Sequence, residues 1–297
     1  MVNAGVSWAL SGADIDLGAL PGGFAPEGAL LENPFSFDLG VAGIAAGTSI
    51  GYAVGAAWTW LILVRGVQDL ALSRAELRPR RPMIVRFLRI GVPNFAEGIA
   101  MWAVNIIVLL FIGQIAAGGG LQGAHIIAIQ WESFSFLPGF AIGTAAATLT
   151  GQYLGAGDPA SARRAVLMCA AFAAVLMGSL GVVFMTFGET LTRVISSEPV
   201  HLEIVPKLLF ICGSVQVFFA FTMVIRQSLR GAGDTRWVFL ITTFSSYGVR
   251  LPATYYFGIV MGLGLPGIWY GLCGEFFIRA ILFGSRFFHG GWQKIRV

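Results

Sequence analysis

The sequence predicts an all-α integral membrane protein. Of its 297 residues, 56% are hydrophobic and only 11% are charged, and the mean hydropathy is +0.78. This composition supplies too little polar surface to cover a soluble globule of this size. Long apolar runs alternate with short polar segments, which is typical of membrane helices threaded back and forth. The net charge of +4 does not indicate a nucleic-acid partner, because most basic residues lie in short loops where they set topology.

Two polar segments, residues 151–164 and 230–236, predict tight hairpins between helices. In the first, glycines and Asp158-Pro159 end one helix, and Asp158 or Ser161 is placed to cap the next. The second repeats the Gly-Ala-Gly-Asp pattern between two further apolar runs. Arginines at these boundaries favour the cytoplasmic side of the membrane.

Residues 1–64 predict the tail of one helical lobe. Met1–Gly12 is apolar but too short to cross a bilayer, Ala13–Asp38 is an acidic irregular loop without Lys or Arg, and Leu39–Val64 is one span. The acidic loop is expected outside. Residues 65–89 hold the densest run of arginines, which predicts a cytoplasmic linker that can include an amphipathic surface helix.

Residues 90–297 predict a complete six-helix lobe, with each span near the roughly 20 residues that a bilayer core requires. The expected spans are Ile90–Gly113, Gln122–Thr150, Ala160–Phe187, Ile204–Leu229, Trp237–Gly258 and Gly264–Phe288. With the arginine-rich linker inside, most of the 19 Lys and Arg fall on the same side, while only Arg193 and Lys207 fall outside. This bias predicts a cytoplasmic C-terminus.

A sequence pattern that occurs twice predicts two equivalent helix bundles. Leu39–Gly47 and Leu263–Gly271 share the pattern Leu-Gly-x-x-Gly-Ile-x-x-Gly, and each opens a span. Parallel repeats of this kind build many transporters. Because Met1 begins inside an apolar segment and only one full bundle follows, we expect an N-terminally truncated chain with one complete bundle and one or two further helices.

Several motifs together resemble the second half of a multidrug and toxic compound extrusion (MATE) transporter. They are Gly91-Val-Pro93, Ala124-His-Ile-Ile-Ala128, Glu132-Ser133, Gly151-Gln152, Leu154-Gly-Ala-Gly157, Arg230-Gly-Ala-Gly-Asp-Thr235, Val249-Arg-Leu-Pro252 and Gly267-Ile-Trp269. The resemblance runs in register from about Asp38 to the C-terminus.

The resemblance implies twelve helices in two lobes that export organic cations and drugs from the cell in exchange for H+ or Na+. This chain would hold part of helix 5, helix 6 and helices 7 to 12, without counterparts of helices 1 to 4. The implied location is the inner (plasma) membrane. The implied partners are a small-molecule organic cation or drug, the lipid bilayer and the missing N-terminal lobe, with no cofactor beyond the coupling ion.

Four residues within the predicted spans are candidates for binding a cation or substrate: Glu97, Glu132, Gln216 and Arg250. An ionised side chain at the bilayer centre costs several kcal/mol unless it is paired or hydrated, so such residues mark functional sites. Glu97 lies four residues after Pro93, whose ring frees backbone carbonyls in the same helix. The alternative for these polar residues is a structural hydrogen bond between helices.

Two arginines within spans need carboxylate partners. Glu275 lies four residues before Arg279, an orientation that pairs well along a helix and predicts a structural ion pair. Arg250 has no local partner, so we expect it to pair with Glu97 or Glu132 on another helix.

Enzymatic signatures are absent from the sequence. It has no Gly-x-x-x-x-Gly-Lys-Ser/Thr loop and no His-Glu-x-x-His, and its cysteines lack metal-ligand spacing. We therefore expect neither an enzyme nor a metal site. Two alternatives to an antiporter are a lipid-linked glycan flippase, which would require a strongly cationic cavity, and a membrane scaffold that does not transport.

Overall fold

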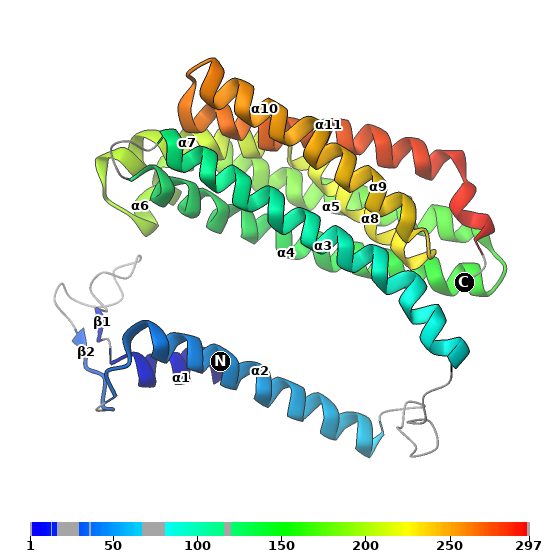
Figure 1. Cartoon of the computed structure of the whole chain (residues 1–297), viewed down its shortest axis with the longest axis horizontal. Helices are drawn as coiled ribbons and strands as arrows, with labels where there is room; N and C mark the ends of the chain where they lie inside the picture. Colours follow the sequence, from blue (N-terminus) through cyan, green and yellow to red (C-terminus); the bar gives the residue numbers. More distant parts are fainter. Residues whose placement is uncertain are drawn as a thin grey trace. The chain divides into compact units, whose positions relative to one another are not determined.

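The computed structural model describes residues 2–12, 14–16, 30–35, 37–66, 81–115 and 120–295. These residues are almost entirely helical and divide into two units, Met1–Ile84 and Val85–Val297 (Figure 1). The predicted all-α fold is confirmed, since β1 (Ile15–Asp16) and β2 (Leu30–Leu31) form only a two-residue antiparallel pair. Residues 17–29 of the predicted acidic loop and 67–80 of the predicted linker lie outside the described residues.

The first unit is a pair of helices, α1 (Val2–Ser11) and α2 (Gly40–Arg65). They approach closely because Gly43 and Gly47 are buried and carry no Cβ; a Cβ on Gly43 would overlap the backbone of Leu10. The hydroxyl of Ser7 donates to the carbonyl oxygen of Ile44 at 3.2 Å. Small residues that let two backbones meet are typical of membrane helix pairs.

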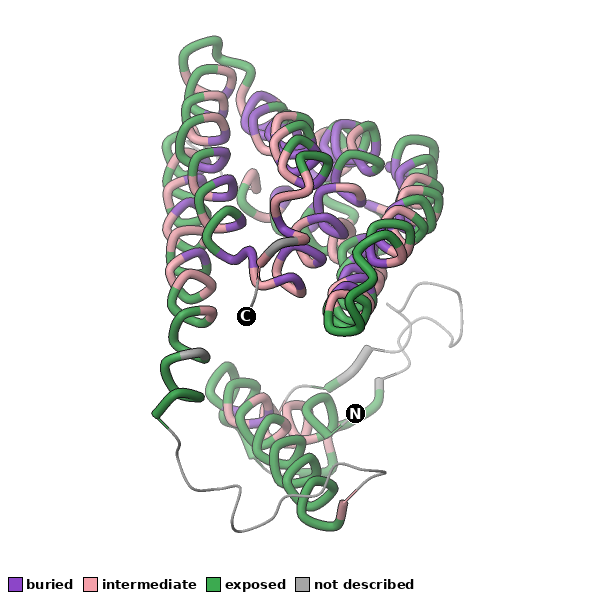
Figure 2. The backbone as a smooth tube through the Cα atoms, turned by 90° about the vertical axis from the view of Figure 1, so that its right-hand side faces the viewer, coloured by how far each residue is buried: buried purple, intermediate pink, exposed green. Residues whose placement is uncertain are grey.

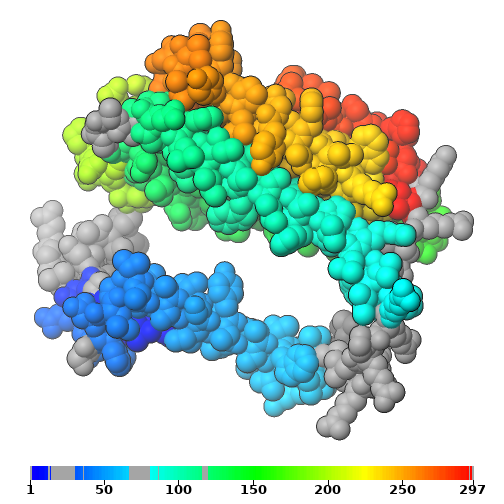
Figure 3. All heavy atoms as spheres, viewed as in Figure 1, coloured from blue at the N-terminus to red at the C-terminus, as the bar shows by residue number. Residues whose placement is uncertain are grey.

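The second unit contains the larger bundle. Its helices are α3 (Arg81–Ile115, which begins in the first unit), α4 (Leu121–Gly155), α5 (Pro159–Thr186), α6 (Gly188–Ile195), α7 (Pro199–Ser214), α8 (Gln216–Gly231), α9 (Thr235–Ser245), α10 (Leu251–Tyr255) and α11 (Gly264–His289). Two π-helical segments, Ser246–Arg250 and Tyr256–Val260, join α9, α10 and the turn before α11, and a 3-10 turn, Gly291–Lys294, follows α11. In Figure 3, α3 lies alongside α9 and α10 on the viewed face of this unit.

Five of the described helices are long and apolar enough to cross a membrane: α2, α3, α4, α5 and α11. A sixth candidate is the pair α7 and α8, which meet at Val215 with a bend of 55°. The span expected at Ile204–Leu229 is therefore broken near its middle. The residues of the span expected at Trp237–Gly258 are helical, as α9, α10 and the two π-helical segments, but these short elements are not among the candidate spans.

The π-helical segment Ser246–Arg250 has an identifiable physical cause. Pro252 has no backbone N–H to donate to the carbonyl of Gly248. In the neighbouring π-helical segment, backbone hydrogen bonds span five residues instead of four, as from the N–H of Leu251 to the carbonyl of Ser246. Near the 55° bend, Gly181 and Gly213 let α5 and α7 touch, because a Cβ on Gly181 would lie 2.6 Å from the carbonyl oxygen of Gly213. Such breaks in membrane helices are tolerated where neighbouring helices satisfy the backbone.

Asp158 caps α5, one of the two alternatives that the sequence offered. Its carboxylate accepts a hydrogen bond from the backbone N–H of Ser161 at 3.0 Å. Hydrogen bonds from the side chain and then the backbone of Ser161 lower the pKa of Asp158. The first hairpin predicted from the sequence is thus a short turn between α4 and α5.

Two apolar clusters fill the second unit. One includes Met177 and Phe283, and the other includes Leu208 and Trp269. Buried positions line the faces that helices turn toward one another, while large apolar side chains stay exposed on the outward faces (Figure 2). This distribution suits a bundle whose outer surface meets lipid rather than water.

Replacement of Gly271 by alanine should destabilise the bundle, because the added Cβ would overlap the backbone nitrogen of Thr254 where α10 meets α11. We expect a loss of about 1–3 kcal/mol, as for other overpacked contacts. The control is Gly274→Ala on the same helix, where nothing lies within 4 Å of the added Cβ. Thermal unfolding in detergent should separate the two variants; equal midpoints would contradict the close contact.

Candidate functional site

Glu97 lies on α3, four residues after Pro93, and is 1% exposed. Its Oε2 accepts a hydrogen bond from Nη2 of Arg230 at 2.6 Å, and its Oε1 lies 3.1 Å from Nε of Arg226. Both arginines are on α8 and one helical turn apart, so a single carboxylate faces two guanidinium groups. Their side chains are about one quarter exposed, at 27% and 25%.

Glu275 is the centre of a second cluster and is also buried. Its carboxylate accepts hydrogen bonds from Nε of Arg250 and Nη2 of Arg279. It also accepts from the hydroxyls of Ser245 at 2.7 Å and Ser246 at 3.2 Å. Because Arg250 lies in the π-helical segment after α9, this cluster ties that segment to α11.

The two clusters carry more positive than negative charge, with four arginines facing two glutamates. Among the described residues, the Nε atoms of Arg226, Arg230 and Arg279 are buried without a hydrogen-bond partner. Each carboxylate is already engaged by two guanidinium groups. Neither glutamate is therefore free to bind a cation unless an arginine first moves away.

Arg250 pairs with Glu275, so the prediction that it pairs with Glu97 or Glu132 is wrong. The sequence assigned Glu275 to Arg279 alone, and those two residues do form an ion pair. A carboxylate has two oxygens, however, and can accept a guanidinium at each. Whether the pair of Glu275 and Arg279 is purely structural stays a prediction.

Arg226 and Arg230 were missed as site residues because the sequence placed them at the cytoplasmic end of a span as topology markers. In the structure both form ion pairs with Glu97 on α3. The available signal was their spacing, since residues four apart share one helix face.

Of the other two candidates, Glu132 lies close enough to Arg250 to interact with it electrostatically, and Gln216 lies at the bend between α7 and α8. Glu132 on α4 is partly buried, and the described part of the chain gives its carboxylate no hydrogen-bond or ion-pair partner. Gln216 is fully buried at the start of α8; its Oε1 accepts from the hydroxyl of Ser135 at 2.7 Å, and its Nε2 contacts Sγ of Cys212 at 3.1 Å. No group of three or more His, Cys, Asp or Glu that could hold a metal ion occurs within the described ranges.

A bundle of long apolar helices with buried ion pairs between its helices defines a multi-pass membrane protein. A family model described as MatE matches residues 93–256. The chain belongs to the MatE family, as its motifs led us to expect.

Several relatives carry the name NorM, among them two that match over most of the chain. The chain is 30% identical over 274 residues to the "Probable multidrug resistance protein NorM" of Thermotoga maritima, covering 90% of the chain and 57% of that protein. It is 30% identical over 255 residues to the "Multidrug resistance protein NorM" of Burkholderia vietnamiensis, covering 84% and 54%. The chain therefore spans little more than half the length of these relatives.

Solved structures show the same fold. A MATE crystal structure in the straight conformation matches with a TM-score of 0.73 at 20% identity, covering 86% of this chain and 58% of that one. The Vibrio cholerae MATE transporter VcmN matches with a TM-score of 0.77 at 15% identity, covering 99% and 62%.

Replacement of Glu275 by alanine should destabilise the chain strongly, because it leaves Arg250 and Arg279 buried without a carboxylate. Removing one side of a buried ion pair typically costs about 3–5 kcal/mol. The control is Glu203→Ala, which removes an exposed pair with Lys207 and should cost less than about 1 kcal/mol.

Thermal unfolding of the two variants in the same detergent checks this expectation. A Glu275→Ala midpoint as close to wild type as that of Glu203→Ala would mean that the two arginines find other partners or water.

Proposed function

We propose that this chain forms the C-terminal lobe, helix 6 and part of helix 5 of an inner-membrane antiporter that exports organic cations or drugs in exchange for H+ or Na+. MatE membership and the relatives named as multidrug resistance proteins support this proposal. The observation that carries it is the buried carboxylate of Glu97, held by two arginines on a neighbouring helix.

Ion binding is coupled to helix movement because H+ or Na+ competes with Arg226 and Arg230 for the carboxylate of Glu97. A proton or Na+ that takes the carboxylate removes the attraction that holds Arg226 and Arg230 against α3. The two arginines then need water or another anion, and their quarter exposure gives them a route to it. The contact between α3 and α8 thus has two arrangements, as a rocking transporter requires.

Glu132 is the remaining candidate for direct contact with a cationic substrate. Within the described residues its carboxylate has no hydrogen-bond partner, so a substrate cation need not displace a protein group from it. Gln216 differs, because its amide is already engaged with Ser135 and Cys212. We assign Gln216 a positioning role at the bend between α7 and α8.

A lipid-linked glycan flippase is the second candidate function, and one observation favours it. The sequence placed only Arg250 and Arg279 inside the bundle, whereas four arginines face two glutamates there. An excess of buried positive charge suits an anionic cargo better than a cationic one.

The proposed orientation places residues 65–89 and the C-terminus in the cytoplasm. The distribution of Lys and Arg supports this orientation, because short loops rich in these residues stay on the cytoplasmic side. In this arrangement the hairpin between α4 and α5 also faces the cytoplasm.

Glu97→Gln should lower antiport by about tenfold or more, a change that requires only about 1.4 kcal/mol in a barrier. The substitution keeps the side-chain size but removes the charge that pairs with Arg226 and Arg230. The measurement is the initial rate of fluorescent organic-cation uptake by proteoliposomes of the whole gene product, under an imposed H+ or Na+ gradient. Glu203→Gln on α7 is the control, because this exposed residue pairs only with Lys207.

Wild-type uptake by a folded Glu97→Gln protein would leave Glu97 a structural role only. No cation uptake by the wild type, with movement of a lipid-linked glycan instead, would favour the flippase.

A further inference from the structure

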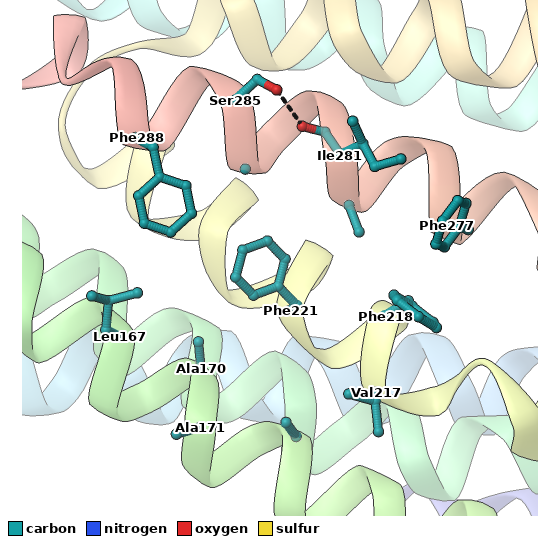
Figure 4. A pocket seen from close by; sticks show the side chains of 13 residues that line it. Leu167, Ala170, Ala171, Val217, Phe218, Phe221, Phe277, Ile281, Ser285 and Phe288 are labelled. Atoms are coloured by element: carbon teal, nitrogen blue, oxygen red, sulfur yellow. Dashed lines mark hydrogen bonds between the residues drawn. The ribbon is translucent and has the colours of Figure 1, made fainter.

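An apolar groove lies between α5, α8 and α11, on residues that neither charged cluster uses (Figure 4). Its volume is about 610 Å³. Leu167 and Ala171 line it from α5, Phe221 from α8, and Ile281 and Phe288 from α11. The hydroxyl of Ser285 at its edge already donates to the carbonyl of Ile281 at 2.8 Å, so the groove offers hydrocarbon contact alone.

One end of the groove is basic. The guanidinium carbon of Arg163 lies 5.5 Å from the ring centroid of Phe288. A neighbouring hollow, lined by Arg163 and Arg164, shares Leu167 and Ala171 with the groove. Apolar and cationic surfaces are therefore continuous at the start of α5.

The charge at this end is only partly neutralised by the protein, because Asp158 in the turn before α5 interacts electrostatically with Arg164. Arg163 and Arg164 are both exposed, and neither has a carboxylate within 4 Å in the part of the chain that the structure describes. Arg286, also near this end of α11, is different: its Nε donates to Asp234 at 2.7 Å, and its guanidinium lies over the ring of Trp237. Two arginines thus remain available to an external anion.

The length of the groove matches one leaflet of a bilayer. Along α11 it runs from Phe277 to Phe288, about 16 Å at 1.5 Å per residue. The hydrocarbon core of a bilayer is about 30 Å thick, so the groove covers about half of it. At the end away from Arg163, Phe218 and Phe277 meet edge to face with ring centroids 5.1 Å apart (Figure 4).

We propose that this groove binds one acyl chain of an anionic phospholipid, whose phosphate pairs with Arg163 and Arg164. Basic residues at the ends of membrane helices attract anionic headgroups, and a groove between helices holds the chain. The same arginines repel an organic cation, which disfavours a drug as the occupant. A second copy of this chain is disfavoured too, because symmetric contact would bring like charges together. The inference rests on this groove alone and is independent of the proposed function.

The test is competition binding of fluorescent phosphatidylglycerol to the purified chain in detergent. Unlabelled phosphatidylglycerol should displace the probe at least about tenfold better than phosphatidylcholine with the same acyl chains. Arg163→Gln with Arg164→Gln should weaken binding by about 10–30-fold, since each basic residue near an anionic lipid contributes about tenfold or less. The control is Arg193→Gln with Lys207→Gln, two basic residues already paired with Glu189 and Glu203.

A second variant isolates the acyl chain. Ala174→Trp fills the groove from a position that the basic hollow does not share, and it should weaken phosphatidylglycerol binding while the two arginines remain. Equal displacement by phosphatidylcholine, or an unchanged affinity in the double arginine variant, would overturn the headgroup assignment. Displacement by inorganic phosphate as effective as by the lipid, or wild-type affinity in Ala174→Trp, would overturn the acyl assignment. Displacement by a lipophilic organic cation, or dimerisation that blocks the probe, would identify a different occupant.

Discussion

Buried charge must be neutralised where it lies, and this constraint organises the second unit. Arg250 and Arg279 share Glu275, while Arg226 and Arg230 share Glu97. An ionised group without a partner in apolar surroundings costs several kcal/mol. The fold is therefore stable only when these arginines lie against their carboxylates. Glu97 and Arg230 are 133 residues apart in the chain, and their ion pair joins α3 to α8.

The charged side chains lie on helices that are interrupted by a π-helical segment or a bend. Arg250 occupies a π-helical segment next to Pro252, and in that segment it lies within hydrogen-bond distance of Glu275 on α11. The bend at Val215 starts a new helix at Gln216, which carries Arg226 and Arg230 toward Glu97. Irregular backbone is tolerated inside a membrane bundle where other groups satisfy it, and such places are where transporters gather their polar groups.

Features that depend on composition and residue spacing could be predicted from the sequence. Contacts that depend on where a helix bends or changes its hydrogen-bond pattern could not. Five of the seven expected spans followed from apolar length. The hairpin at Asp158 followed from capping chemistry, and the contact of Glu275 with Arg279 from a four-residue interval. The partner of Arg250 did not, because no local pattern reports which helix a side chain in a π-helical segment will face. Arg226 and Arg230 were assigned to the cytoplasmic end of a helix, where basic residues set membrane topology. The sequence pattern near a helix end is the same whether the basic side chain is hydrated or paired with a carboxylate.

A double-mutant cycle between Arg250 and Glu275 tests the charge network most directly. The unfolding free energies of Arg250→Ala, Glu275→Ala and the combined variant should be non-additive by about 0.5–3 kcal/mol, because the two side chains share one hydrogen-bonded contact. The parallel cycle of Arg250 with Glu132 should show a weaker coupling, because these two side chains interact through their charges without a hydrogen-bonded contact in the part of the chain that the structure describes. Coupling to Glu132 together with additivity for Glu275 would contradict the network.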